Sequence, residues 1–138
     1  MDCIFCKIAN GEIPSATLFE DEAVRVILDL GPAARGHALV LPKVHMKDST
    51  EATEAMLGHM MAIGASIGKA QMKAFGADGF NMIQNNGEAA GQSVFHLHLH
   101  VIPRKMGDDA VRLWTPGETT PEEMQETARA IRAQLDVE

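Results

Sequence analysis

Long apolar stretches are missing from this 138-residue chain. No run approaches the roughly 20 consecutive apolar residues that a membrane-spanning helix requires. The first residues also lack the basic and apolar regions of a secretory signal peptide. We therefore expect a cytoplasmic protein with no membrane partner.

Positive charge is scarce as well. Lysine and arginine together number 12 against 19 aspartates and glutamates, so the formal net charge is −7. This balance argues against a protein that binds nucleic acid polymers regardless of sequence, because such a protein needs a basic surface. A small phosphate-bearing ligand remains compatible, since one pocket can have the opposite sign to the whole chain. The sequence contains no Walker-type phosphate loop.

Cysteine occurs only twice, as Cys3 and Cys6. Two cysteines in a reducing compartment are not expected to form a disulfide framework, and the strand-to-helix context of a thioredoxin-like pair is missing. Two thiolates at this C-x-x-C spacing more often form half of a zinc site, and His45 is a suitable third ligand. The alternative is a reduced pair that binds no metal.

Length and composition indicate one folded domain over residues 1–138. Hydrophobic residues make up 46% of the chain and charged residues 22%, as in ordinary soluble proteins. A chain of this length can bury a real core. Internal repeats, low-complexity segments and obvious linkers are absent from the sequence.

The segment 96–102 reads HLHLHVI and carries the strongest signal in the chain. Its period of two predicts a strand with His96, His98 and His100 on one face and the apolar residues between them in the core. Neighbouring imidazoles on that face would lie roughly 7 Å apart. Such an array suits two chemistries: it can hold a divalent metal, or one neutral imidazole can attack phosphorus.

Apolar periodicity predicts the remaining elements. Alternation indicates short strands near 18–20, 23–29 and 80–84, and a buried strand at 37–41. A helical pattern follows the cap candidates at 48–51 and ends at Gly76. Thr120, Pro121 and Glu123 begin an amphipathic C-terminal helix near 121–135, which we expect to be an appendage. Residues 87–91 are expected to form a flexible loop.

Residues 96–102 resemble the signature of the histidine triad (HIT) family, and similar flanks occur at 4–8, 11–14, 36–43 and 91–93. The resemblance implies an α+β HIT-like fold: an antiparallel sheet of about five strands with a long helix packed on it and a C-terminal helix. It also implies a homodimeric nucleotide-binding hydrolase. The expected reaction is attack on the α-phosphate of nucleoside phosphoryl compounds, such as purine nucleoside phosphoramidates, through a nucleotidyl-histidine intermediate.

The resemblance also implies roles for catalytic residues. His98 is the expected nucleophile, with its ring facing an open pocket and its second ring nitrogen donating to a backbone carbonyl. His100 is expected to stabilise the charge that develops on a phosphate oxygen, and Ser93 to assist at the leaving group. In zinc-carrying members the first triad histidine, here His96, completes the site formed by two cysteines and a histidine.

Four further residues are expected to bind substrate. Asp29 would accept hydrogen bonds from the ribose hydroxyls, although it would equally suit a cap on the turn before Pro32. His37 is expected to support the site by hydrogen bonding, with a plain packed histidine as the alternative. Asn85 and Gln92 are expected near the phosphate.

The sequence leaves other functions open. Residues 103–108 look more like the dinucleoside polyphosphate hydrolases, whereas Asn85 and Ser93 look more like the phosphoramidases. A nucleotide-binding interaction protein with incidental turnover is a second class. A third interpretation has His96, His98 and His100 binding one catalytic metal.

Overall fold

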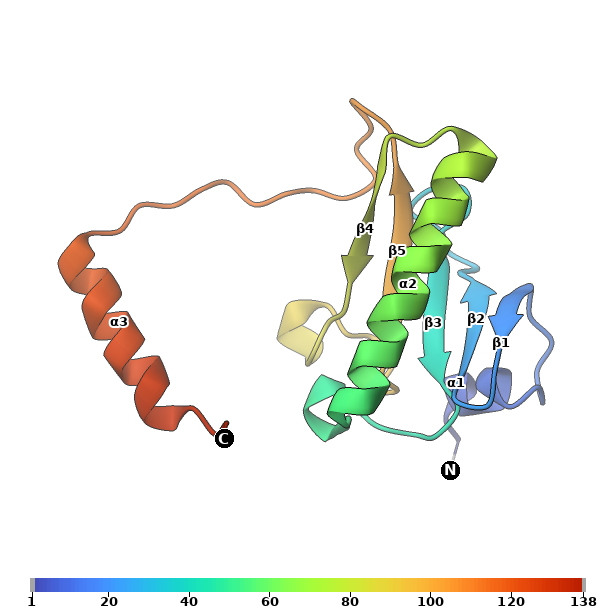
Figure 1. The fold of residues 1–138 in the computed structure, drawn as a ribbon, viewed down its shortest axis with the longest axis horizontal. Coiled ribbons are helices and arrows are strands. Elements are labelled where there is room, and N and C mark those ends of the chain that lie inside the picture. The colour runs from blue at the N-terminus through green and yellow to red at the C-terminus, as the bar shows by residue number, and fades with distance from the viewer. Residues whose placement is uncertain (1, 138) are drawn as a thin grey trace.

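The computed structural model describes residues 2–137, so the two ends of the expected domain, 1 and 138, lie outside the described residues. A five-stranded antiparallel sheet, in the order β1-β2-β3-β5-β4, forms the body (Figure 1). The strands are β1 (Thr17–Glu20), β2 (Val24–Leu28), β3 (Ala38–Pro42), β4 (Gly79–Ile83) and β5 (Leu99–Arg104). Three α-helices and two short 3₁₀ turns make up the rest of the regular structure within residues 2–137. The predicted α+β fold with about five strands is confirmed.

Helix α2 (Glu54–Phe75) covers one face of the sheet. Thr53 caps it by accepting from the backbone N–H of Met56, and Gly76 ends it in the left-handed region at φ 64°. The main core lies between this helix and the apolar faces of β2, β3 and β5. Gly64 and Gly68 let the sheet approach: a Cβ at Gly68 would lie 2.3 Å from the ring of Phe80.

The long helix begins later than predicted. The cap candidates at 48–51 form a separate 3₁₀ turn, Ser49–Glu51, in which Asp48 accepts from the backbone N–H of Thr50. Ala52 is extended, at φ −91° and ψ 153°, and this interrupts the helical path before Thr53. The loop before the triad segment also contains a 3₁₀ turn, Glu88–Ala90, where no regular structure was expected.

The triad strand is shorter than predicted, since β5 begins at Leu99 and only His100 lies within it. The antiparallel register with β3 pairs Val40 with Leu99, and two residues further on it would place Leu97 opposite Pro42. Proline has no N–H for a ladder bond. The Pro42 carbonyl instead accepts from the His96 ring at 2.8 Å. The predicted apolar side is confirmed, because Leu97 is as buried as the strand residues that follow it.

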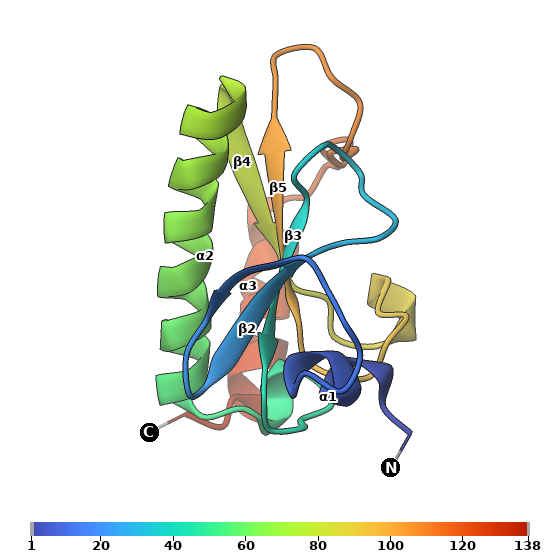
Figure 2. The same cartoon turned by 90° about the vertical axis from the view of Figure 1, so that its right-hand side faces the viewer.

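A short helix, α1 (Ile4–Ala9), lies on the opposite face of the sheet from α2 (Figure 2). Its Ile8 and Ala9 pack with Ile27 and Leu39 in a second core cluster. Periodicity did not predict this helix because six residues span less than two turns. Cys3 caps it, with its Sγ accepting from the N–H of Cys6 at 3.3 Å.

Helix α3 (Pro121–Gln134) confirms the predicted C-terminal helix. It stands away from the body at the end of an extended segment, on the side of β4 (Figure 1). None of its residues is buried. Within residues 2–137, no helix has both the length and the apolar character needed to cross a membrane.

Candidate functional site

A cleft of about 240 Å³ opens on the α1 side of the sheet. It is lined by four residues predicted for catalysis or substrate binding, namely Asp29, Ser93, His98 and His100. Asp29 follows β2, Ser93 and His98 precede β5, and His100 belongs to β5. The pairing of β2 and β5 on either side of β3 brings these distant segments together.

The ring of His98 is held in one orientation. Its Nδ1 lies 2.7 Å from the His96 carbonyl oxygen, which can only accept, so Nδ1 carries the proton. This confirms the predicted bond to a backbone carbonyl and leaves Nε2 as the unprotonated nitrogen. Phe5 packs edge-on against the ring at a centroid distance of 5.0 Å. His98 lines the cleft, although only 7% of its surface is exposed.

A chain of hydrogen bonds determines which nitrogen of His100 carries the proton. The backbone N–H of Ala33 donates to His37 Nδ1 at 3.0 Å, so neutral His37 carries its proton on Nε2. That N–H points to His100 Nδ1 at 2.9 Å, which must therefore accept. His100 then has its proton on Nε2. His37 thus makes a hydrogen bond to a triad histidine, as its expected supporting role requires.

Burial keeps these two imidazoles neutral. The pKa of His100 is lowered to about 4, first by burial and then by the neighbouring His98 and His37 rings. Burial also lowers the pKa of His37, an effect that the Asp29 carboxylate opposes. Neutral rings at pH 7 are needed for the donor chain, because a protonated His100 could not accept from His37.

Asp29 has one oxygen for each of its two predicted roles. Its Oδ1 accepts from the backbone N–H of Gly31 at 2.8 Å, which caps the turn after β2. Its Oδ2 lies 3.6 Å from His37 Nε2, and the carboxylate borders the cleft. Since Ala33 fixes the proton of His37 on Nε2, that nitrogen has no lone pair for a metal. This tautomer therefore argues against a cation bound between Asp29, His37 and His100.

The predicted zinc ligands converge on one point. Ligand atoms of Cys3, Cys6, His45 and His96 all lie within 4.8 Å of one another. His96 Nδ1 is 3.4 Å from both sulfur atoms, and His45 Nδ1 is 3.3 Å from Cys6 Sγ. Bonds of about 2.0–2.3 Å to a tetrahedral zinc ion place its ligands roughly 3.5 Å apart. The donor set and its spacing therefore fit zinc.

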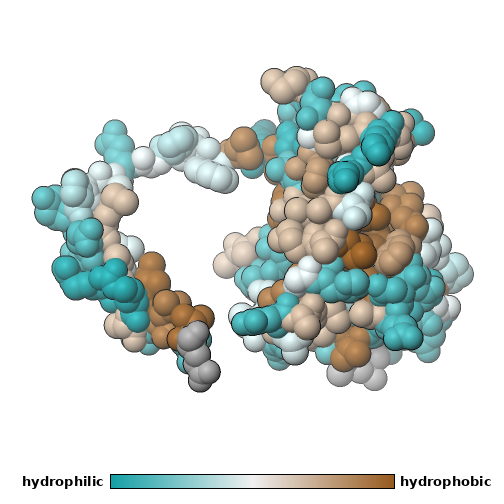
Figure 3. All heavy atoms as spheres, viewed as in Figure 1, coloured by the Kyte–Doolittle hydropathy of each residue, from teal (hydrophilic) through white to brown (hydrophobic). Residues whose placement is uncertain are grey.

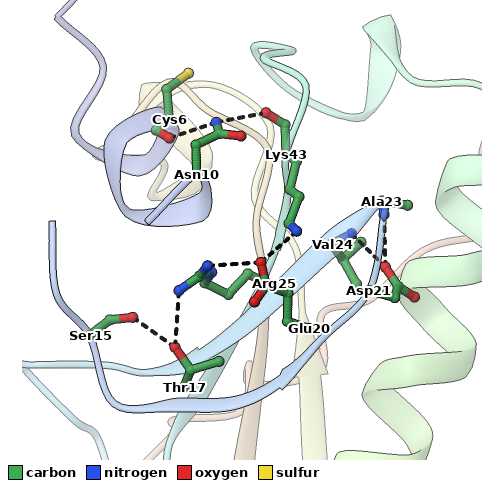
Figure 4. Close-up of polar contacts among 10 residues, drawn as sticks. All are labelled: Cys6, Asn10, Ser15, Thr17, Glu20, Asp21, Ala23, Val24, Arg25 and Lys43. Atoms are coloured by element: carbon green, nitrogen blue, oxygen red, sulfur yellow. Dashed lines mark hydrogen bonds and ion pairs between the residues drawn. The ribbon is translucent and has the colours of Figure 1, made fainter. Parts of the chain in front are cut away.

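Contacts outside this ligand set hold it in shape. His96 Nε2 donates to the Pro42 carbonyl, which leaves Nδ1 free to ligate. Asn10, at the end of α1, donates to the carbonyls of Cys6 and Lys43 at 2.8 and 3.2 Å (Figure 4). Lys43 also donates to Glu20 at 2.5 Å, beside the Arg25 bond to the same carboxylate. These hydrogen bonds connect helix α1, which carries Cys6, to the segment that carries His45.

The triad is divided between two sites. His96 belongs to the zinc ligand set, whereas His98 and His100 face the cleft with ring centroids 5.0 Å apart. Among residues 2–137, no cluster able to hold a cation contains all three triad histidines. The interpretation of the triad as one catalytic metal site therefore has no support from the arrangement.

Three of the four predicted substrate-binding residues do not line the cleft, namely His37, Asn85 and Gln92. Gln92 is buried, and its amide bonds the backbone of Gly87, Lys47 and Val94. Asn85 lies against Gly91, where a Cβ would be 3.5 Å from its Nδ2. Gln92 therefore supports the loop that leads to Ser93, and Asn85 lies against that loop.

Much of the cleft wall was not identified from the sequence. The additional lining residues are apolar: Ile4, Phe5, Ile8, Ile27, Leu28, Leu30, Leu39 and Val94. Three of them come from α1, and this unpredicted helix closes one side of the site. Apolar residues carry no chemical signature, so only their contacts identify them. Leu30 is unusual among them, because it is an apolar residue that is fully exposed next to Asp29.

The chain is similar to curated enzymes. It is 45% identical over 107 residues, 78% of its length, to Adenylylsulfatase HINT3 of Arabidopsis thaliana, but spans only 54% of that protein. It is 36% identical over 135 residues to Adenosine 5'-monophosphoramidase HNT1 of Saccharomyces cerevisiae, covering 97% of this chain and 83% of that protein. Both names describe enzymes that act on adenylyl compounds, which supports nucleotide hydrolysis at the level of the family.

Solved structures are also similar to this chain in fold and sequence. A HIT family protein from Bacillus subtilis matches with a TM-score of 0.90 and 38% identity over 100% of both chains. Residues 115–138 make up about a sixth of the chain, so this score requires that the C-terminal segment superposes as well. A zinc-bound histidine triad family protein from Mycobacterium smegmatis matches with a TM-score of 0.77 and 41% identity over 97% and 95% of the chains. Because the HIT domain model also matches residues 10–107, this chain belongs to the HIT domain family.

Proposed function

We propose that this protein hydrolyses purine nucleoside phosphoramidates, compounds in which an amine is bonded to the α-phosphorus of a nucleoside monophosphate. One observation carries the proposal: the His96 carbonyl holds a proton of His98 on Nδ1, which leaves Nε2 to act as the nucleophile in the cleft of about 240 Å³. The names of the two enzymes described above support this choice of substrate class.

In the first step, His98 Nε2 attacks the α-phosphorus. A phosphorus–nitrogen bond to the ring forms, the bond to the amine breaks, and the amine leaves with a proton that the Ser93 hydroxyl passes on as it takes one from solvent. His98 keeps its Nδ1 proton on the His96 carbonyl, so the positive charge of the nucleotidylated ring is stabilised by that contact. In the second step, water attacks the phosphorus and releases the nucleoside monophosphate and neutral His98.

His100 stabilises the negative charge that develops on the phosphate. Its Nε2–H is the only donor of a ring whose Nδ1 is occupied by His37. That donor would hydrogen-bond a non-bridging phosphate oxygen and stabilise its growing negative charge. Asp29 Oδ2 would accept from the ribose hydroxyls, and the apolar wall from α1, β2 and β3 would hold the base.

We also propose that zinc bound by Cys3, Cys6, His45 and His96 is structural. When bound, it crosslinks α1 to the segments around His45 and His96, and thereby holds Phe5 against His98. His96 joins the two sites, because its ring faces the cysteines and its carbonyl accepts from His98. Reduced thiols at these positions suit a cytoplasmic protein. A homodimer is proposed from the family resemblance, with the open edge of β4 available for pairing.

The experiment compares adenosine phosphoramidate with diadenosine tetraphosphate for the parent protein and His98→Ala. We expect the parent to favour the phosphoramidate, and His98→Ala to lose turnover while still binding AMP. A rapid acid quench followed by mass spectrometry should detect a nucleotidyl adduct on the peptide containing His98. His59→Ala is the matched control, since His59 lies on α2 and bonds Asp21. Parent-level turnover by His98→Ala would refute the nucleophile, and preference for the tetraphosphate would refute the substrate class.

A further inference from the structure

Helix α3 has an apolar stripe with nothing to cover it. Met124, Ile131 and Leu135 lie on one side of the helix and are 57%, 60% and 60% exposed. Figure 3 shows apolar residues gathered on the side of this helix that faces the space between it and the body. An isolated helix of 14 residues is only marginally stable in water. Its stability must come from packing against another surface.

The body has an apolar groove that is also uncovered. It runs between α2 and the β1–β2 edge of the sheet, has a volume of about 480 Å³, and is lined chiefly by Leu18, Leu28, Ile67, Ala70, Ala74 and Phe75. Helix α2 covers the sheet over β3, β5 and β4 but leaves this edge open. The apolar surface in Figure 3 is concentrated beside α2 on this side.

The C-terminal arm, which consists of the extended segment after β5 and helix α3, cannot cover the groove of its own chain in this arrangement. The groove lies at the β1–β2 edge, whereas the arm leaves from the end of β5 and extends beyond β4, the opposite edge (Figure 1). The superposition with the Bacillus subtilis crystal structure includes the C-terminal segment, so the extended position is shared with a crystallised relative.

The charges of the two surfaces are complementary. The first turn of α3 is acidic, with Glu122 and Glu123. The groove is bordered by Arg35, and Lys69 and Lys73 are exposed on α2 beside its alanines. Opposite charges at the rim favour one orientation of a docked helix.

We propose that α3 docks into the groove of a second copy of this chain, so that each subunit covers the groove of the other with its C-terminal helix. This inference rests on the proposed homodimer but not on the proposed reaction. Exchange of the arms buries the apolar stripe of α3 and the apolar groove together, and it requires no protein other than a second copy of this chain.

Amide hydrogen exchange on the full-length chain measures the docking directly. We expect the amides of α3 to exchange at least about a hundredfold more slowly than in a free peptide, and dilution to the monomer to remove this protection. Ile131→Glu in the stripe and Ala70→Glu in the groove should each abolish the protection. The matched controls are Gln125→Glu on the other side of α3 and Ala55→Glu at the exposed start of α2, and neither should change it.

Mixing the two damaged chains distinguishes docking between chains from docking within one. The Ala70→Glu chain has an intact arm, and the Ile131→Glu chain has an intact groove. When the Ala70→Glu chain is isotopically labelled and mixed with the other, protection of its α3 should return. No recovery on mixing would overturn docking between copies.

Other outcomes separate the two proposals. A parent chain that sediments as a monomer refutes the homodimer and, with it, the exchange of arms. A dimer in which Ile131→Glu removes the protection while Ala70→Glu does not refutes the groove as the docking site. A dimer whose α3 exchanges as fast as a free peptide refutes docking altogether.

Discussion

Replacing His37 with phenylalanine tests the donor chain that ends at His100. The change keeps an aromatic ring in the same place but removes the N–H that donates to His100 Nδ1 at 2.9 Å. His100 then has a buried acceptor without a partner, which costs about 1–3 kcal/mol in the tautomer that the reaction needs. The ring relieves this cost by moving its proton to Nδ1 or by rotating.

Either response removes the Nε2–H donor from the cleft. A cost of about 1–3 kcal/mol corresponds to a loss of about fivefold to 150-fold in kcat, whereas deletion of such a donor is expected to cost about a hundredfold to a thousandfold. The affinity for AMP should change little. His37→Gln keeps an amide N–H and should retain more activity than His37→Phe. The matched control is His59→Phe, because His59 is 38% exposed on α2 and bonds Asp21 away from the cleft.

Two measurements check this expectation independently. Steady-state kinetics with adenosine phosphoramidate gives kcat and KM for each variant. Nitrogen-15 NMR of the histidine rings reports which nitrogen of His100 carries the proton, whether or not the substrate is correct. A His37→Phe protein with parental kcat, or one whose His100 still carries its proton on Nε2, would show that His37 does not fix the tautomer.

Three further predictions concern stability. Cys6→Ser should lower the zinc content, measured by inductively coupled plasma mass spectrometry, from one ion per chain to well below one, and reduce Tm by about 10 °C; equal metal content would exclude the proposed ligand set. Gly68→Ala should lower the free energy of unfolding in urea by about 1–3 kcal/mol, because the new Cβ meets the Phe80 ring. Gly58→Ala, on the same helix with nothing within 4 Å, should raise it by about 0.5–1 kcal/mol, and equal effects would contradict the packing argument. The folded-state pKa of His100, about 4, lies below the usual 6.5, so the unfolded chain binds the proton first as pH falls. The parent should therefore lose about 2 kcal/mol between pH 6.5 and pH 4, and His100→Gln should lose less; identical pH profiles in urea titrations would contradict this.

The triad segment illustrates both the reach and the limit of the sequence. Alternation identified the buried face correctly, because the period of a strand also holds for extended chain just outside a ladder. It could not show where the ladder stops. Pro42 on the neighbouring strand ends the pairing, and it is 55 residues away in the sequence from Leu97, which the register would place opposite it. The ladder therefore begins at Leu99 and leaves His96 and His98 outside it.

Spacing and residue type indicated Cys3, Cys6 and His45 as candidate zinc ligands, because two thiolates at this spacing often form half of a zinc site, and the family resemblance added His96. The roles of Gln92 and Asn85 were more difficult to predict, because amide side chains form hydrogen bonds with backbone groups as readily as with ligands. The placement of Gln92 beside the loop follows from its bonds to Gly87, Lys47 and Val94, and Asn85 lies against Gly91 of the same loop. Side chains with several possible partners are assigned only when those partners are known.

The sequence by itself determined the family, the order along the chain of the strands and of helices α2 and α3, and which residues are candidates for the chemistry. These properties depend on local periodicity, on caps and on side chains with distinctive reactivity. Only the tertiary structure decided that the triad is divided between two sites, that α1 forms a wall of the cleft, and which nitrogen of each imidazole carries the proton. These outcomes depend on contacts between distant segments: His96 with the cysteines of α1, and His37 with His100. A hydrogen bond across 63 residues fixes the tautomer of His100, and no pattern within one segment contains that information.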